Sequence, residues 1–174
     1  MNTKTIDVQE LIGSLQNEVR ILLHLAAKID RSQLDYRPTP AQRSTIELLR
    51  YLSVMGPNLI QFIKSGAFDL PAWHATLEAT SGASLDQVLS AIEKQPGQYA
   101  EMLNGFTQEE LRGEIELFGR KSTGAAYLLN LLLGSHAAYR MQLFLYLKSS
   151  GRGELNTINL WAGMDAPVAA AVAA

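Results

Sequence analysis

The chain has 174 residues, of which 47% are hydrophobic, with a net charge of -2 and no cysteine. This length suits one domain that buries its own core, and the missing cysteines exclude disulfides, thiolate metal sites and cysteine nucleophiles. The scattered Lys and Arg residues form no basic patch for nucleic acid or an anionic membrane, and no apolar run approaches the roughly 20 residues that span a bilayer. We therefore expect a cytoplasmic protein with neither nucleic acid nor membrane as a partner.

The first part of the chain predicts two amphipathic helices. Hydrophobic residues recur every three or four positions over residues 5–30, which is the pattern of a helix with one buried face. A connector with two prolines follows at residues 33–44. Ser44 and Glu47 then have the spacing of a capping box, in which each side chain bonds a free backbone N–H, so a second helix is expected over residues 45–64.

The middle of the chain predicts a long loop and a third helix. Pro57 lies inside the second helix, where we expect a kink or break because proline removes a helical hydrogen bond. Residues 67–83 are expected to form a long loop, and loops of this length are often functional or partly ordered as a lid. A third helix is expected over residues 85–104, opened by a capping box at Ser84 and kinked or split at Pro96.

The last long helix has the most unusual composition. Residues 114–118 alternate charged and apolar side chains and predict a short extended crossing. Residues 122–151 then predict one helix that is apolar nearly all round, which requires other helices around it. Polar groups in such a helix need partners, so they mark a site or the remnant of one. They are Ser135, His136, Tyr139 and Gln142.

These predicted elements give an all-α fold. Four helices without an internal repeat indicate a single four-helix bundle over residues 1–150. Residues 151–174 have no helical period and are expected to form an irregular C-terminal tail, in which Leu160 and Trp161 pack on the bundle and the last residues are frayed.

Two segments resemble a known family. Residues 37–52, with RPTP followed by RSTIELLRYL, resemble the start of the second helix in the DinB-like (DinB/YfiT) four-helix bundles. Residues 139–151, beginning with YRMQL, resemble the end of their last long helix. The resemblance implies a bundle with up-down-down-up topology, a left-handed twist and long loops. Many members are homodimers, many bind a divalent metal through three histidines, and some are thiol-dependent transferases or isomerases.

The chain departs from that pattern at the metal site, because the three histidines would fall at Tyr51, Ser135 and Tyr139. Ligands four residues apart share one helix face and can hold a metal with a third ligand from a facing helix. Neutral hydroxyls, however, are poor ligands for zinc or nickel. His136 does not restore the site, since it lies about 100° around the helix from Ser135 and is followed four positions later by the cation Arg140. We therefore expect no metal and no other cofactor.

The leading hypothesis is a bundle that has lost its metal and acts as a small-molecule-binding or interaction module. Tyr51, Ser135 and Tyr139 would form a hydroxyl cluster in the former metal site, joined by Asn58 or Gln142. His136 is a further candidate residue of this pocket. The apolar excess on the last helix also favours a homodimer, since one bundle does not cover every side of it.

The function of the polar residues has two further interpretations. In one, the protein is a metal-dependent or thiol-dependent transferase or hydrolase with altered ligands, which predicts an open cavity at the cluster. In the other, the polar residues are purely structural and the protein acts through its outer surface. In the leading hypothesis His136 is a paired histidine near the bundle surface or at a dimer contact.

Overall fold

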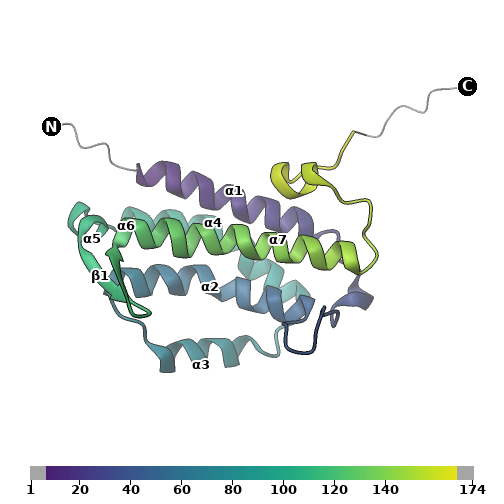
Figure 1. The fold of residues 1–174 in the computed structure, drawn as a ribbon, viewed down its shortest axis with the longest axis horizontal. Coiled ribbons are helices and arrows are strands. Elements are labelled where there is room, and N and C mark those ends of the chain that lie inside the picture. Colours follow the sequence, from purple (N-terminus) through teal and green to yellow (C-terminus); the bar gives the residue numbers. More distant parts are fainter. Residues whose placement is uncertain (1–6, 168–174) are drawn as a thin grey trace, which may run out of the picture.

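Four long helices form the body of the computed structural model, which describes residues 7–167 (Figure 1). Helix α4 packs against both α1 and α2, and α7 packs against the same two helices. The predicted all-α four-helix bundle is confirmed. The four helices are α1 (Val8–Ala26), α2 (Thr45–Ser65), α4 (Leu85–Asn104) and α7 (Gly134–Ser149).

The direction of the helices explains the long connection between the second and third of them. Helices α1 and α7 run in one direction and α2 and α4 in the other (Figure 1), which is an up-down-down-up arrangement. Because α2 and α4 are parallel, the chain must return along the whole bundle between them. The return contains an 11-residue helix, α3 (Leu70–Thr80), so the prediction of a loop over residues 67–83 is wrong. Asp69 caps this helix and Pro71 lies in its first turn, and both favour a helix start.

Both internal prolines lie within continuous helices, so of the expected kink or break at each, the break does not occur. Pro57 has no N–H for the carbonyl one turn earlier, and its ring pushes against that turn. Two side-chain amides donate to neighbouring carbonyls there: Gln95 to Leu52 and Asn58 to Val54, each at 2.8 Å. These amides bond the carbonyls on either side of Ser53, whose own carbonyl is the one that Pro57 leaves without a helical donor. The capping boxes predicted at the starts of α2 and α4 are present.

The predicted extended crossing has a partner and forms a hairpin. Strand β1 (Glu114–Leu117) pairs in antiparallel fashion with β2 (Arg120–Thr123), after the short helix α5 (Gln108–Arg112). The two turn residues, Phe118 and Gly119, have positive φ angles of 54° and 72°, as a tight hairpin turn requires. The hydroxyl of Tyr127 donates to the carbonyl of Leu117 at 3.0 Å and so ties the hairpin to the start of the last helix.

The last long helix contains a change of helical pitch that the sequence did not predict. Thr123 caps α6 (Gly124–Tyr127), and the π-helical segment η2 (Leu128–Leu133) then leads into α7. A π-turn holds more residues than an α-turn, so it rotates the residues that follow relative to those before it. In α7 this rotation turns His136 and Arg140 inward, where each is buried.

The C-terminal segment folds back over α1. Arg20 of α1 donates to the carbonyls of Ala162 and Gly163 at 2.8 and 3.2 Å, close to the short π-helical segment η3 (Ile158–Ala162). Leu160 is buried, whereas Trp161 stays 64% exposed while covering the guanidinium of Arg140. The residues expected to be frayed, from 168 on, lie outside the described part of the chain.

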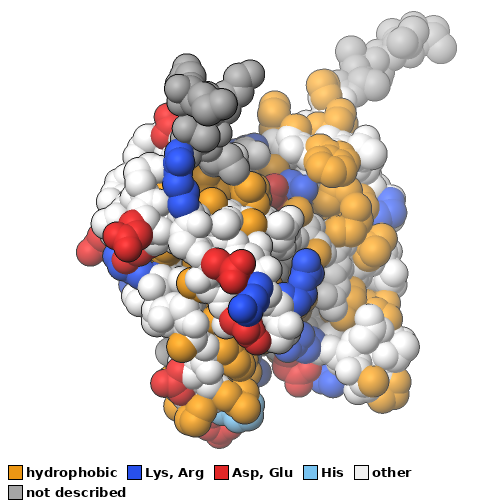
Figure 2. Space-filling view, turned by 60° about the vertical axis from the view of Figure 1, so that its left-hand side comes forward, with side chains coloured by type: hydrophobic (Ala, Val, Ile, Leu, Met, Phe, Trp, Pro, Cys, Tyr) orange, Lys and Arg blue, Asp and Glu red, His pale blue; other side chains and the backbone are white. Residues whose placement is uncertain are grey.

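Exposed hydrophobic side chains gather below the C-terminal end of the described chain in Figure 2. The larger ones on α7 and the C-terminal segment are Met141, Leu145, Ile158, Trp161 and Met164. Within residues 7–167, no helix is both long enough and apolar enough to cross a bilayer.

Candidate functional site

Two of the three residues at the expected metal position meet in the structure. The rings of Tyr51 on α2 and Tyr139 on α7 lie 5.1 Å apart between centroids, in an edge-to-face arrangement. Their hydroxyl oxygens are 3.5 Å apart, which is at the long limit of a hydrogen bond. Ser135 lies one turn before Tyr139 and is half-buried, and its side chain makes no hydrogen bond to another residue of the 7–167 region. The predicted hydroxyl cluster is therefore a tyrosine pair with a serine beside it.

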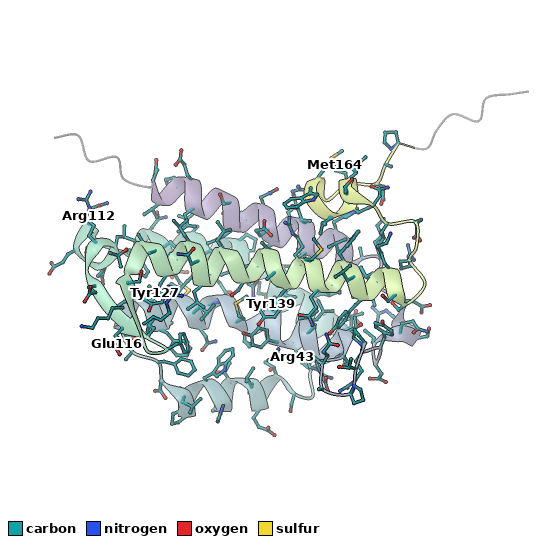
Figure 3. All side chains as sticks on the ribbon, viewed as in Figure 1. Arg43, Arg112, Glu116, Tyr127, Tyr139 and Met164 are labelled. Atoms are coloured by element: carbon teal, nitrogen blue, oxygen red, sulfur yellow. The ribbon has the colours of Figure 1, made fainter. Side chains whose placement is uncertain are left out.

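Two residues that the sequence analysis did not select complete this site. The guanidinium carbon of Arg43 lies 4.2 Å from the ring centre of Tyr51. Trp73 of α3 packs against the same ring with its centroid 5.7 Å away. In Figure 3, Tyr139 projects from α7 towards α2 and α3, and Arg43 lies nearby at the start of α2. The Tyr146 hydroxyl donates to the Arg43 carbonyl at 3.0 Å, which fixes the connector on α7. We call Arg43, Tyr51, Trp73, Ser135 and Tyr139 the tyrosine site.

The tyrosine site is one end of a row of aromatic side chains. The row connects the hairpin tip to α7, and successive ring centroids are 4.7 to 6.3 Å apart, within the range of favourable aromatic pairs. Helix α3 has no buried residue, so this row provides much of its contact with the bundle. The members in order are Phe118, Phe68, Phe62, Trp73, Tyr51 and Tyr139.

The electrostatics of the tyrosine site favour neutral hydroxyls beside a cation. Burial raises the pKa of Tyr51, and the hydrogen bond and charge of Tyr139 raise it further, while Arg43 lowers it by less. The hydroxyl of Tyr51 therefore stays protonated at neutral pH. Within residues 7–167, no carboxylate forms an ion pair with Arg43, which is an exposed residue.

A divalent metal does not fit this set of groups. The described part of the chain contains no cluster of three or more His, Cys, Asp or Glu side chains that could hold a metal ion. Protonated tyrosine and serine hydroxyls are weak ligands for zinc or nickel. The positive charge of Arg43 beside Tyr51 also repels a cation. The charged group at this site is thus a cation, whereas a metal centre needs groups that donate electrons to a cation.

Asn58 and Gln142 bond other partners than the two tyrosines. Asn58 donates to the carbonyl of Val54 beside the proline of α2, and it borders a groove of about 700 Å³ between α2 and α4. Gln142 donates to the hydroxyl of Tyr146 at 2.6 Å, beside a hollow of about 290 Å³ between the connector and α7. Each amide satisfies a nearer acceptor than the tyrosine pair.

His136 lies in the core and not near the surface, which corrects the expectation for this residue. It is 2% exposed, and its Nε2 atom is 2.8 Å from the hydroxyl of Tyr99 on α4. Burial lowers the pKa of His136 to about 4, so the imidazole is neutral at physiological pH. Gly56 of α2 makes room for this pair, because a Cβ atom there would overlap the hydroxyl of Tyr99. The preceding π-helical segment, which turns His136 inward, has no clear signature in the sequence.

Comparison with known proteins identifies the architecture. No family model and no curated protein matches the chain. Among solved structures, a DinB-like protein from Bacillus subtilis, YjoA, matches with a TM-score of 0.64 and 23% sequence identity. The match covers 84% of this chain and 95% of YjoA. The chain therefore has the fold of a DinB-like protein.

Proposed function

We propose that this protein binds a small molecule at the tyrosine site and does so without a divalent metal. The observation that carries the proposal is the half-buried Tyr51–Tyr139 pair, flanked by an indole and by an arginine that has no carboxylate partner in the described chain. Binding sites combine apolar and aromatic walls with a few convergent polar groups, and this site has both.

Binding is favoured over catalysis by the position of the imidazole that follows Ser135 in the chain. A serine nucleophile requires a base within hydrogen-bond reach. His136 follows Ser135 directly in the chain, but its imidazole bonds Tyr99 in the core. Ser135 therefore has no imidazole from α7 placed to activate it.

A probe titration tests the binding proposal. Phenol, benzoate and benzylamine are added separately to the full chain while the aromatic NMR signals of Tyr51, Tyr139 and Tyr99 are followed, with assignments from single Tyr→Phe variants. We expect at least one probe to shift Tyr51 and Tyr139 together while Tyr99 stays unchanged. If no probe shifts the first two signals at millimolar concentration, the proposal is wrong.

A histidine-restoring variant tests the statement about the metal. We expect the wild-type chain to bind no stoichiometric zinc. The triple variant Tyr51→His, Ser135→His, Tyr139→His should bind about one zinc per chain, because three imidazoles would then converge from two facing helices. The double variant that keeps Tyr51 is the control and should bind zinc more weakly. Stoichiometric zinc in the wild-type protein, measured by elemental analysis after dialysis, would contradict the proposal.

We also propose that the protein forms a homodimer through the outer face of α7. Arg140 is the only formally charged residue between Gly134 and Leu147, and it is buried, so this face is uncharged. Leu145 is 53% exposed there and Met141 37%. Sedimentation equilibrium should show a dimer that Leu145→Glu dissociates, because a charge is costly in an apolar interface.

The matched control for the dimer is Ser90→Glu, which places the same charge at an exposed position on α4. This variant should remain a dimer. A wild-type chain that is monomeric at about 100 μM, or a dimer unaffected by Leu145→Glu, would contradict the proposed interface.

A further inference from the structure

The charge of the tyrosine site indicates what kind of molecule it binds. Its polar groups are the guanidinium of Arg43 and the hydroxyls of Tyr51, Tyr139 and Ser135. All of these can donate a hydrogen bond, and none is an anion. Such a set complements an acceptor with negative charge.

The guanidinium of Arg43 lies over the ring of Tyr51 and pairs with no carboxylate among residues 7–167. A guanidinium that stacks over an aromatic ring keeps its N–H groups in its own plane, where they remain free to bond. Planar carboxylates match this fork with two parallel hydrogen bonds. The stacking also limits the conformations of a long side chain, which lowers the entropy lost on binding.

Arg37 lies on the same connector as Arg43, but its charge is paired with a carboxylate. Its guanidinium lies 3.2 Å from a carboxylate oxygen of Glu47, so its charge is already paired. Arg43, six residues later on the same connector, has no such partner among residues 7–167. The difference makes Arg43 the available anion-binding group and Arg37 its matched control.

We infer that the tyrosine site selects small aromatic carboxylates. Arg43 pairs with the carboxylate, the hydroxyls of Tyr139 and Tyr51 donate to it, and the aromatic ring of the ligand packs against Trp73. This inference rests on the proposed binding function and adds the charge of the ligand. A position that holds a cation in metal-binding bundles would thus hold an anion here.

The two tryptophans of the chain provide a direct readout. Trp73 lies in the tyrosine site, whereas Trp161 covers Arg140 beside α1, so their indole N–H signals report on two separate regions. The full chain is titrated with benzoate, benzyl alcohol and benzylamine at constant ionic strength, and Kd is taken from the shift of the Trp73 signal. The signal of Trp161 is the internal control and should not move.

We expect benzoate to bind about tenfold more tightly than benzyl alcohol, since one hydrogen-bonded charge contributes on that scale. Benzylamine should bind most weakly, because Arg43 repels it. Arg43→Gln should remove the preference for benzoate, and Arg37→Gln should leave it unchanged. Arg43→Lys should keep part of it, because the charge remains and the fork is lost.

The outcomes separate the inference from the proposed function. If benzyl alcohol and benzoate shift Trp73 with equal Kd, and Arg43→Gln changes neither, the site binds small molecules but does not select anions, and the inference is wrong. If none of the three probes shifts Trp73, both the proposed function and the inference are wrong. Arg43 is exposed and its backbone carbonyl keeps the bond from Tyr146 in every variant, so these substitutions should not unfold the chain.

Discussion

His136 and Tyr139 lie three positions apart on α7, and each pairs with a tyrosine of another helix, but the two pairs differ in burial. His136 contacts a tyrosine hydroxyl in the core, and Tyr139 contacts another on the flank of the bundle. The first pair is sealed between α2, α4 and α7, with both partners buried. The second is half-buried and lies beside an exposed arginine. Similar chemical groups therefore serve packing in one place, and we propose that in the other, where they are less buried, they bind a ligand.

The largest expected effect on stability comes from adding a side chain at Gly56, which lies against Tyr99 of the buried His136–Tyr99 pair. Gly56→Ala would place a Cβ atom 2.7 Å from the Cζ atom of Tyr99 and in conflict with its hydroxyl, so either α2 or α4 must shift. We expect a loss of about 3 kcal/mol or more in the free energy of unfolding, measured by urea denaturation.

Gly13→Ala is the control for this substitution. Gly13 is also inside a helix, but no atom lies within 4 Å of a Cβ placed there. It should raise stability by up to about 1 kcal/mol, because alanine is the better helix former. Equal effects of the two substitutions would show that the close approach to Tyr99 does not constrain the core.

The sealed pair should also make stability depend on pH. The pKa of His136 is lowered from 6.5 to about 4 in the folded chain, so the unfolded chain takes up the proton first as pH falls. Stability is therefore fully present above pH 6.5 and decreases towards pH 4, by about 3 kcal/mol for this residue. Carboxylates also titrate in this range, so the test is the difference in pH slope between the wild-type chain and His136→Gln. Parallel slopes would contradict the assignment of a neutral buried imidazole.

The sequence predicted the fold well because the fold depends on local patterns. The capping boxes at Ser44 and Ser84 and the regular hydrophobic spacing fixed the starts of the helices that make up the bundle. The crossover helix α3 was missed because none of its residues is buried, so its sequence shows no regular hydrophobic pattern. Its cap and first-turn proline were the available signals.

The site was predicted only in part, for two physical reasons. The resemblance to the DinB-like bundles places Tyr51 and Tyr139 at positions that share one site, and their rings do meet. The inward rotation of His136 depends on the π-helical segment before it, and helix pitch is not visible in side-chain spacing. Arg43 lies on a connector, where its position depends on the bond from Tyr146 and not on any helical period.

Helix α3, which packs beside the Tyr51–Tyr139 pair, should contribute less to the stability of the chain than the helices of the core do. Trp73→Ala removes the ring that joins α3 to Tyr51 and Phe62, so we expect a loss of about 1–2 kcal/mol, less than for a fully buried tryptophan. Hydrogen exchange should become faster in α3 while α1 and α4 keep their protection. Leu70→Ala, at a 48% exposed position of the same helix, is the control and should change little. Faster exchange throughout the bundle would mean that α3 is part of its cooperative core.

The most direct measurement removes the same atom from each pair. Tyr99→Phe and Tyr139→Phe each delete one hydroxyl, and urea unfolding is recorded with and without benzoate, which stabilises only a chain that binds it. We predict that Tyr99→Phe lowers stability by about 1–3 kcal/mol but keeps the benzoate-induced shift, because it leaves a buried imidazole unpaired and does not touch the ligand. Tyr139→Phe should change stability by less than about 1 kcal/mol and reduce the benzoate-induced shift. If Tyr139→Phe lowers stability more and Tyr99→Phe reduces the benzoate-induced shift, or if both variants behave alike, the account is contradicted. The account assigns the His136–Tyr99 pair to structure and the Tyr51–Tyr139 pair to binding.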